Sequence, residues 1–111
     1  MGRSAIAYVA ASVGSYGAYL ADGSEYSGKY ALNDAELKAW HEPRLLTLCE
    51  SGADLLAIET IPVLREAECI IAALPENSPP AWVAFSCMDG MPCWCASAKS
   101  ADLRRAACAS C

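Results

Sequence analysis

One stretch of the chain decides its fold, residues 52–62, which reads Gly52-Ala53-Asp54-Leu55-Leu56-Ala57-Ile58-Glu59-Thr60-Ile61-Pro62. Its four apolar residues, 55–58, follow one another without polar alternation. Such a run is typical of a strand buried on both faces, as in a parallel sheet that is covered by helices. Pro62 lies about where a following helix would begin. The stretch therefore predicts a strand-to-helix unit of an α/β fold.

Glu59 is the first candidate functional residue because it directly follows the apolar run. Parallel α/β sheets and barrels bind their ligands at the carboxyl ends of strands. One interpretation of Glu59 is therefore a carboxylate that contacts a ligand. The other is a carboxylate that complements the positive end of the next helix, which is worth a few tenths to about 1 kcal/mol. The position of Glu59 leaves both interpretations open.

Two further apolar runs predict strands before and after this unit, at residues 5–11 and 81–86. Apolar residues at helical spacing connect the three strands, first between residues 33 and 52 and then over residues 63–74. Strand, helix, strand, helix, strand with short links implies right-handed βαβ units. We therefore expect three parallel strands.

The first of these helical segments contains several residues with a predictable role. Asn33 is expected to cap the helix, with Glu36 reaching back as in a capping box. Pro43 predicts two consecutive helices or one bent helix. His41, the only histidine, is interpreted as a helix-junction residue that hydrogen-bonds locally and not as a base or metal ligand. Gly52 is expected to end the segment in the left-handed conformation.

A long connection, residues 12–28, follows the first predicted strand and contains four glycines and three tyrosines. Most strand-to-helix connections need only a few residues. Glycines allow close backbone approach, and tyrosines offer flat apolar faces with a hydroxyl at the tip. The connection is either a loop that covers a substrate or a structured surface loop pinned by its own aromatic side chains.

Composition excludes several classes of protein. The chain has 111 residues, of which 55% are hydrophobic and 19% charged, and a complete barrel typically needs about 250 residues. It has no apolar run long enough for a membrane span and no signal peptide, so we expect a soluble, cytoplasmic protein without a membrane partner. The net charge of −5 and the lack of a basic patch argue against nucleic-acid binding.

The seven cysteines form no recognisable site. An odd count without a secretory signal is poor evidence for a disulfide framework. Three cysteines are expected to be single, small buried residues of the regular part, namely Cys49, Cys69 and Cys87. Four others crowd into the last stretch, at Cys93, Cys95, Cys108 and Cys111. Their spacing is not that of a standard zinc ribbon, so no zinc site is predicted there.

Four motifs stand in order over roughly residues 6–90: Ser12-Val13-Gly14-x-Tyr16-Gly17-Ala18-Tyr19-Leu20-Ala21-Asp22-Gly23-Ser24-Glu25-Tyr26, His41-x-Pro43-Arg44-Leu45, Gly52-Ala53-Asp54-Leu55-Leu56-x-x-Glu59-Thr60-Ile61-Pro62 and Trp82-x-x-Phe85-Ser86-x-x-Asp89-Gly90. In this combination the chain resembles the homocysteine S-methyltransferase family. Ser15 stands where that family usually has proline. The resemblance implies an α/β fold that is a partial (β/α)8 TIM barrel, with parallel strands corresponding to about the third to fifth.

The resemblance also implies an activity. Members of the family transfer a methyl group from S-methylmethionine or a similar donor to homocysteine, which gives methionine. They hold zinc through three cysteine thiolates, and the metal binds the homocysteine sulfur as a thiolate. A carboxylate at the end of the fourth strand helps to hold the substrate's amino group, and Glu59 is its match here, so Glu59 is the implied substrate-binding residue.

The family's zinc motifs, Gly-x-Asn-Cys and Gly-Gly-Cys-Cys, do not occur in this sequence. Zinc is therefore expected in the full-length family but not bound by this chain. We expect a partial homocysteine-binding barrel domain over residues 1–90 and a divergent, poorly ordered Cys-rich tail over residues 91–111.

These expectations describe a truncated fragment. Its partners by resemblance are homocysteine and a methyl donor, and the isolated chain is expected to be inactive. The alternative is a non-catalytic remnant or interaction module of the same fold. Unpaired sheet edges and apolar helix faces predict self-association.

Overall fold

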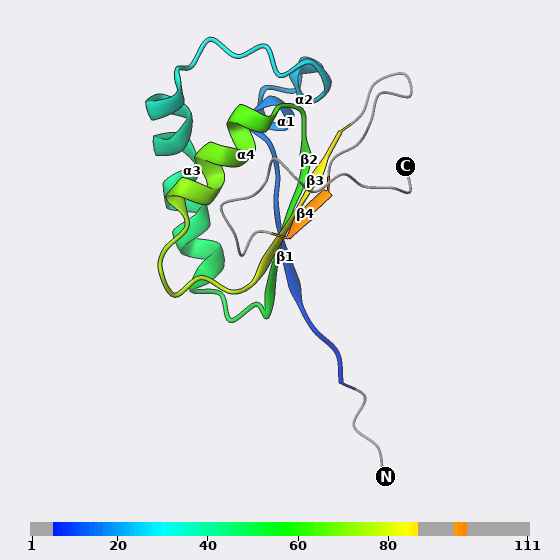
Figure 1. The fold of residues 1–111 in the computed structure, drawn as a ribbon, viewed down its shortest axis with the longest axis vertical. Helices are drawn as coiled ribbons and strands as arrows, with labels where there is room; N and C mark the ends of the chain where they lie inside the picture. Colours follow the sequence, from blue (N-terminus) through cyan, green and yellow to red (C-terminus); the bar gives the residue numbers. More distant parts are fainter. Residues whose placement is uncertain (1–5, 87–94, 98–111) are drawn as a thin grey trace.

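The computed structural model describes residues 6–86 and the backbone of residues 95–97. Its elements are, in order, β1 Ala10–Val13, α1 Tyr16–Leu20, α2 Ser24–Ser27, α3 Asp34–Cys49, β2 Leu55–Ile61, α4 Leu64–Ala73, β3 Ala81–Phe85 and β4 Cys95–Ser97. One sheet contains the strands in the order β1-β2-β3-β4 (Figure 1). The first three are parallel, and β4 is antiparallel to β3. The three predicted parallel strands are therefore confirmed.

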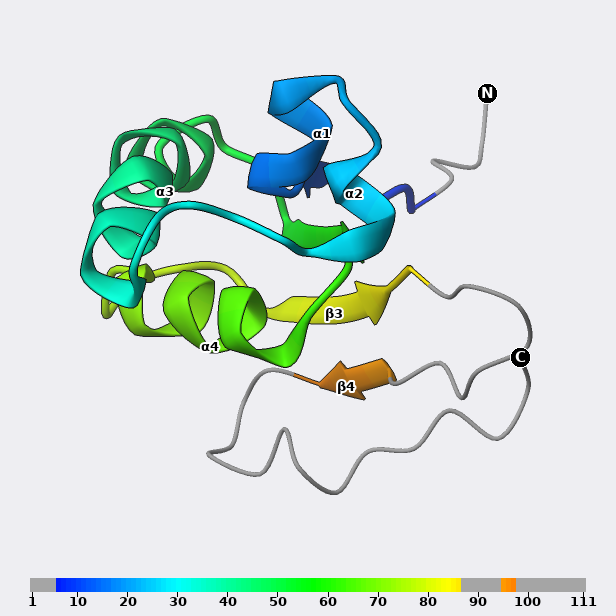
Figure 2. The same ribbon diagram turned by 90° about the horizontal axis from the view of Figure 1, so that it is seen from above.

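The helices form two groups around this sheet. The longer helices, α3 and α4, pack against each other on one face of the sheet, whereas α1 and α2 lie at the end where β1, β2 and β3 finish (Figures 1 and 2). The core is the apolar layer of fully buried side chains between the sheet and the long helices: Val13, Leu45, Leu56, Ile58, Ile61, Ala67, Ile70 and Val83. Removal of each large apolar side chain from water contributes roughly 1.5–3 kcal/mol.

The central strand β2 has the burial that its sequence predicts. Three successive residues are buried, Leu56, Ala57 and Ile58, so both faces of the strand are covered at this point. In the register of the sheet, Ile58 lies between Val13 of β1 and Val83 of β3. All three side chains are fully buried, so they join the three strands into one apolar row.

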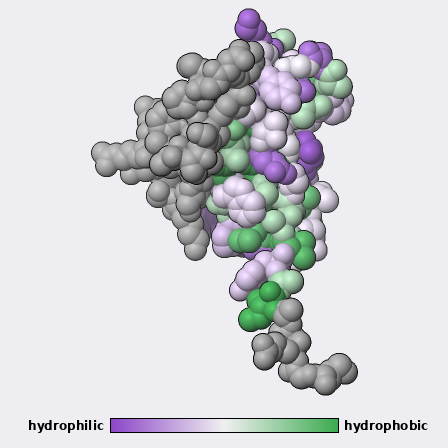
Figure 3. Space-filling view, turned by 90° about the vertical axis from the view of Figure 1, so that its right-hand side faces the viewer, coloured by the Kyte–Doolittle hydropathy of each residue, from purple (hydrophilic) through white to green (hydrophobic). Residues whose placement is uncertain are grey.

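The first strand lies later in the chain than predicted. It covers Ala10–Val13 instead of residues 5–11. The reason is the partner strand: pairing begins with Ala10 opposite Leu55, directly after the turn that precedes β2. Residues 6–9 have no neighbouring strand in the described part of the chain and are exposed, and Figure 3 shows hydrophobic surface at that lower end of the molecule.

Helix α3 runs through Pro43 without interruption, so the two-helix alternative is wrong. A proline inside a helix costs about 3 kcal/mol or more. Burial of Leu37 and Leu45 on either side of Pro43 offsets that cost. At the start of the helix, the Asn33 side chain accepts from the Glu36 amide at 2.8 Å and donates to the Glu36 carboxylate at 2.9 Å. The cap is confirmed, although Glu36 reaches the side chain of Asn33 and not its backbone amide.

Two further predictions concern the end of α3 at Gly52 and the start of α4 at Pro62. Gly52 has φ +84°, which confirms the left-handed turn after α3. Helix α4 begins at Leu64, so Pro62 lies two residues before the helix and not at its first position. None of the helices in the described residues is long and apolar enough to span a bilayer.

The long connection after β1 is more regular than a loop because it contains α1 and α2. Ser15 caps α1, its Oγ accepting from the Ala18 amide at 3.1 Å. Strand β4 was not predicted, and it pairs through Ala84 opposite Cys95. The predicted domain boundary at residue 90 and the predicted poorly ordered tail otherwise lie outside the described residues.

Candidate functional site

Glu59 lies in the carboxyl half of β2, because the strand continues to Ile61 and does not end at Ile58. Its side chain is exposed. Its Oε1 accepts a hydrogen bond of 2.5 Å from the Ser12 hydroxyl of the neighbouring strand β1. Two adjacent parallel strands thus bring a hydroxyl and a carboxylate together near their carboxyl ends. No local sequence pattern connects Ser12 with Glu59, since 47 residues separate them.

The backbone next to Glu59 is irregular. Thr60 has φ +58°, and the register between β2 and β3 shifts between Ile58 and Ile61. A β-branched residue in this left-handed region is an outlier, and such strain costs roughly 1–3 kcal/mol. The irregularity breaks the alternation of the strand, so that Glu59 and Thr60 are both exposed before Ile61 is buried again. Bulges of this kind re-aim side chains and are frequent next to active sites.

Residues 16–30, which contain α1 and α2, lie over the carboxyl ends of the strands and are called the cap (Figure 1). The Ser86 hydroxyl, just after β3, donates to the Glu25 carbonyl oxygen of α2 at 2.7 Å. The Ser86 amide donates to the Ile61 carbonyl oxygen at the end of β2 at 3.0 Å. These two bonds fix the cap to the carboxyl ends of β2 and β3.

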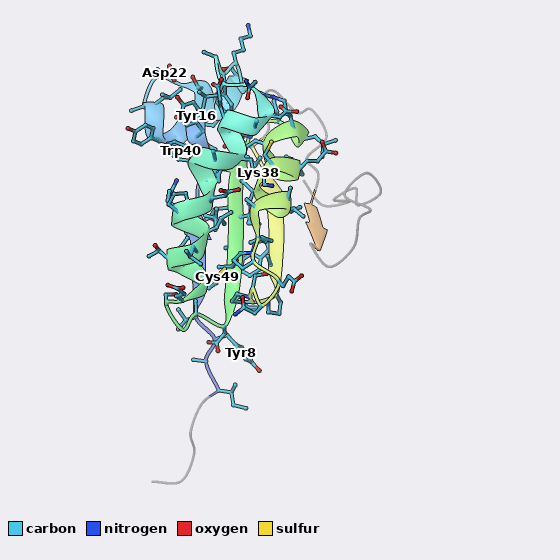
Figure 4. All side chains as sticks on the ribbon, turned by 90° about the vertical axis from the view of Figure 1, so that its left-hand side faces the viewer. Tyr8, Tyr16, Asp22, Lys38, Trp40 and Cys49 are labelled. Atoms are coloured by element: carbon cyan, nitrogen blue, oxygen red, sulfur yellow. The ribbon has the colours of Figure 1, made fainter. Side chains whose placement is uncertain are left out.

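Aromatic side chains pin the same cap to α3. The Tyr16 ring centroid lies 5.0 Å from that of Trp40 (Figure 4). It lies 5.2 Å from that of Tyr30, and both pairs have steep interplanar angles. The ring of Tyr19 also packs against Trp40, with 5.3 Å between the ring centroids. Each such pair contributes about 0.5–1.5 kcal/mol beyond its buried area. The connection is therefore both pinned by aromatic side chains and placed across the strand ends, so the two sequence interpretations are compatible.

One open depression lies beside this cap, and a second lies between β1 and α3. The first has a volume of about 530 Å³ and is lined by Gly14, Ser15, Ala18, Tyr19, Trp40 and Arg44. The second has a volume of about 310 Å³ and is lined by Ser12, Pro43, Arg44, Thr47 and Leu48. Arg44 borders both, with its guanidinium carbon 5.0 Å from the centre of the Trp40 ring. Glu59 lines neither depression.

A second carboxylate, Glu66, was missed by sequence analysis. It is fully buried in the first turn of α4. Three donors meet it: the Tyr16 amide at 2.6 Å, the Tyr30 hydroxyl at 2.7 Å and His41 Nε2 at 2.9 Å. The sequence signal was its position, four residues before Ile70 and next to Ala67, on the apolar face of α4.

His41 corrects one prediction. It is fully buried in the middle of α3, and its described partner is Glu66, 25 residues away, so it is not a helix-junction residue with local hydrogen bonds. Because α3 does not break at Pro43, there is no junction beside it. Its face of α3 points to α4, and the contact with Glu66 is therefore a bond between helices.

The described cysteines do not fit a zinc site. Cys69 donates to the carbonyl oxygen of Asp34, the first residue of α3, whereas Cys49 is the last residue of the same helix. Asp34 and Cys49 lie roughly 22 Å apart along a helix of this length, so Cys49 is far from the end of α3 that Cys69 contacts. Burial raises the pKa of both thiols, which disfavours the thiolate that zinc binds. No group of three or more potential metal ligands occurs among the described residues.

The side chains of the other cysteines, at positions 87, 93, 95, 108 and 111, lie outside the described residues. The expectation that this chain binds no zinc therefore stays a prediction.

The chain is similar to known proteins over most of its length. The model of the homocysteine S-methyltransferase family matches residues 2–107. A homocysteine S-methyltransferase of Bacillus subtilis (strain 168) is 55% identical over 84 residues, which are 75% of this chain and 27% of that protein. Homocysteine S-methyltransferase 1 of Arabidopsis thaliana is 54% identical over 88 residues, which are 76% of this chain and 27% of that protein.

A betaine-homocysteine S-methyltransferase of Drosophila melanogaster is 47% identical over 91 residues, which are 78% of this chain and 28% of that protein. The chain thus spans little more than a quarter of the length of these relatives. No solved structure shows a significant match.

Proposed function

Because this chain belongs to the homocysteine S-methyltransferase family, we propose that its three parallel strands are part of a (β/α)8 barrel, about the third to fifth strands, with a substrate site at their carboxyl ends. The parallel order of β1, β2 and β3 supports this assignment. So does the packing of α3 and α4 on a single face, since the helices of such a barrel form an outer ring.

In this proposal Glu59 binds the ammonium group of homocysteine. The observation that carries it is the 2.5 Å hydrogen bond from the Ser12 hydroxyl to Glu59 Oε1, which orients an exposed carboxylate at the carboxyl edge. The bond occupies one oxygen and leaves Oε2 for the substrate. Water exclusion in a complete barrel would strengthen the charge pair. The cap formed by α1 and α2 lies where it can help to exclude that water.

The proposed reaction is methyl transfer from S-methylmethionine or a similar donor to homocysteine. The homocysteine thiol loses its proton to water, and the resulting thiolate sulfur forms a bond to the methyl carbon while the bond from that carbon to the donor sulfur breaks. With S-methylmethionine the products are two molecules of methionine. The family resemblance implies zinc in the complete protein, and its ligands would lie outside the described residues of this chain. A cytoplasmic location stays a prediction.

Replacement of Glu59 by glutamine should weaken homocysteine binding in a complete barrel. A suitable host is a chimera in which residues 6–86 replace the matching segment of the Bacillus subtilis relative. We expect a loss of about 1–3 kcal/mol, the scale of a charge-assisted hydrogen bond, because glutamine keeps the shape but removes the charge. Calorimetric titration with homocysteine measures the loss, and metal analysis should show unchanged zinc content.

The matched control is Glu50→Gln, which removes an exposed carboxylate at the end of α3. It should leave homocysteine affinity unchanged. The isolated chain, mixed with zinc, homocysteine and S-methylmethionine, should show no methyl transfer. Unchanged affinity in the Glu59→Gln chimera, or loss of its zinc, would give Glu59 a different role. Turnover by the isolated chain would contradict its proposed inactivity.

A second candidate function is association without catalysis. It is favoured by the outer side of β1, which has no strand partner in the described residues, and by the exposed side chains that lead to it, Ile6, Tyr8 and Val9. Residues 6–13 carry no charge or proline that would discourage edge pairing. We expect concentration-dependent self-association in sedimentation velocity, reduced by Val9→Lys. A chain that stays monomeric at all concentrations would exclude this candidate.

A further inference from the structure

We infer that Glu66 is a positioning residue for the proposed homocysteine site, because its buried carboxylate holds both ends of the cap, residues 16–30, across the carboxyl ends of the strands. The inference rests on the proposed function for its relation to substrate. The structural part stands on the contacts of Glu66 alone. Glu66 is fully buried, and so it is not placed to touch substrate itself.

One carboxylate holds the two ends of the cap. Oε1 accepts from the amide of Tyr16, the first residue of α1, at 2.6 Å. Oε2 accepts from the hydroxyl of Tyr30, after α2, at 2.7 Å. The Gly17 amide donates to the same Tyr30 oxygen at 3.1 Å, which closes a ring of bonds between the ends. The cap therefore cannot open at either end without leaving this carboxylate with fewer donors.

A charged group suits this position better than an apolar one. Tyr16 contributes a backbone amide, and buried backbone donors need an acceptor. A carboxylate supplies two oxygens with several lone pairs, whereas an isolated buried carboxylate would be costly. Three donors remove that cost here, the third being His41 Nε2 at 2.9 Å. The imidazole must carry its proton on Nε2 to donate, and its buried Nδ1 has no hydrogen-bond partner in the described residues.

Tyr30 is held in the protonated form that donates to Glu66. Burial first, and then the hydrogen bond and negative charge of Glu66, raise the pKa of the Tyr30 phenol above its ordinary value. The phenol therefore keeps its proton and stays a donor over the pH range in which an exposed tyrosine begins to ionise. Since the folded form holds its proton more tightly, the stabilisation by Tyr30 is present below pH 10 and is lost as the pH rises further.

The path from Glu66 to the site is short. Tyr16 is four residues after Ser12, and Ser15 and Gly14 between them lead directly out of β1. Ser12 is the residue that holds Glu59. A displaced Tyr16 would therefore change the end of β1 and the orientation of Glu59. The other side of the cap is held independently by the bond between Ser86 and Glu25, so loss of Glu66 should loosen the cap without releasing it.

The test is hydrogen exchange of the full 111-residue chain, measured by mass spectrometry, with the Glu66→Gln variant. Exchange of amides 16–30 should accelerate by at least about tenfold, the scale of a lost hydrogen bond to a charged group. Exchange in β2 should not change. The control Glu76→Gln, an exposed residue between α4 and β3, should not change the exchange of residues 16–30.

Unchanged exchange in residues 16–30, or an equal acceleration in β2, would overturn the inference, because Glu66 would then be an ordinary core residue. If Glu66→Gln does not fold, Tyr30→Phe serves instead, since it removes one donor and leaves the carboxylate in place. It should accelerate exchange of residues 16–30 alone, and an unselective or absent change would again overturn the inference. No measurement uses homocysteine, so failure of the role proposed for Glu59 would leave these results unaffected.

Discussion

Replacement of Leu45 by alanine should lower the free energy of unfolding by about 2–5 kcal/mol. Leu45 is fully buried where α3 packs on the sheet, and it belongs to the same apolar core as Val13 and Ile58. Alanine would remove three carbon atoms from this core and leave a cavity that the surrounding strands cannot fill. Urea unfolding followed by circular dichroism, at concentrations too low for self-association, measures the loss.

The matched control is the next residue, Leu46. It has the same side chain on the same helix, but 50% of its surface is exposed. Leu46→Ala should therefore cost less than about 1 kcal/mol, as is usual for surface positions. Equal losses at both positions would mean that α3 does not present the face to the sheet that the structure shows.

Gly17→Ala should be the most damaging change in the cap. A Cβ at this position would lie 2.4 Å from the carbonyl carbon of Ser24 and 2.5 Å from the amide nitrogen of Glu25. These are backbone atoms of α2, which cannot rotate away as a side chain could. We expect a loss of about 1–3 kcal/mol, the usual cost of overpacking, together with separation of α1 from α2. The same unfolding experiment and the near-ultraviolet signal of the tyrosines measure both effects.

Gly14→Ala is the control for this prediction. Gly14 precedes α1 by two residues, and a Cβ there would meet no atom within 4 Å. Its effect on the free energy of unfolding should lie within about 0.5 kcal/mol. If the two variants are equally stable, α1 and α2 do not approach each other as closely as the structure shows.

The sequence by itself determined the features that depend on neighbouring residues. The apolar run before Glu59 predicted the central strand, since four apolar residues in succession are typical of a strand that is covered on both faces. Asn33 predicted the start of α3, because its side chain accepts from an amide three residues away. Repetition of strand and helix predicted the parallel order of β1, β2 and β3, because right-handed crossovers allow few other arrangements.

Tertiary structure alone decided the features that depend on distant partners. The bond between Glu66 and Tyr16 joins residues 50 positions apart, and that between Ser12 and Glu59 joins residues 47 apart. No local pattern specifies such pairs, because they depend on how α1, α4 and the strands are placed together. Likewise, packing of α3 on the sheet outweighs the local preference of Pro43, and the bulge at Thr60 places a β-branched residue where its own propensity disfavours it. At Pro43 and Thr60 the energy of contacts between elements exceeds the local preference. A sequence pattern records only the local preference.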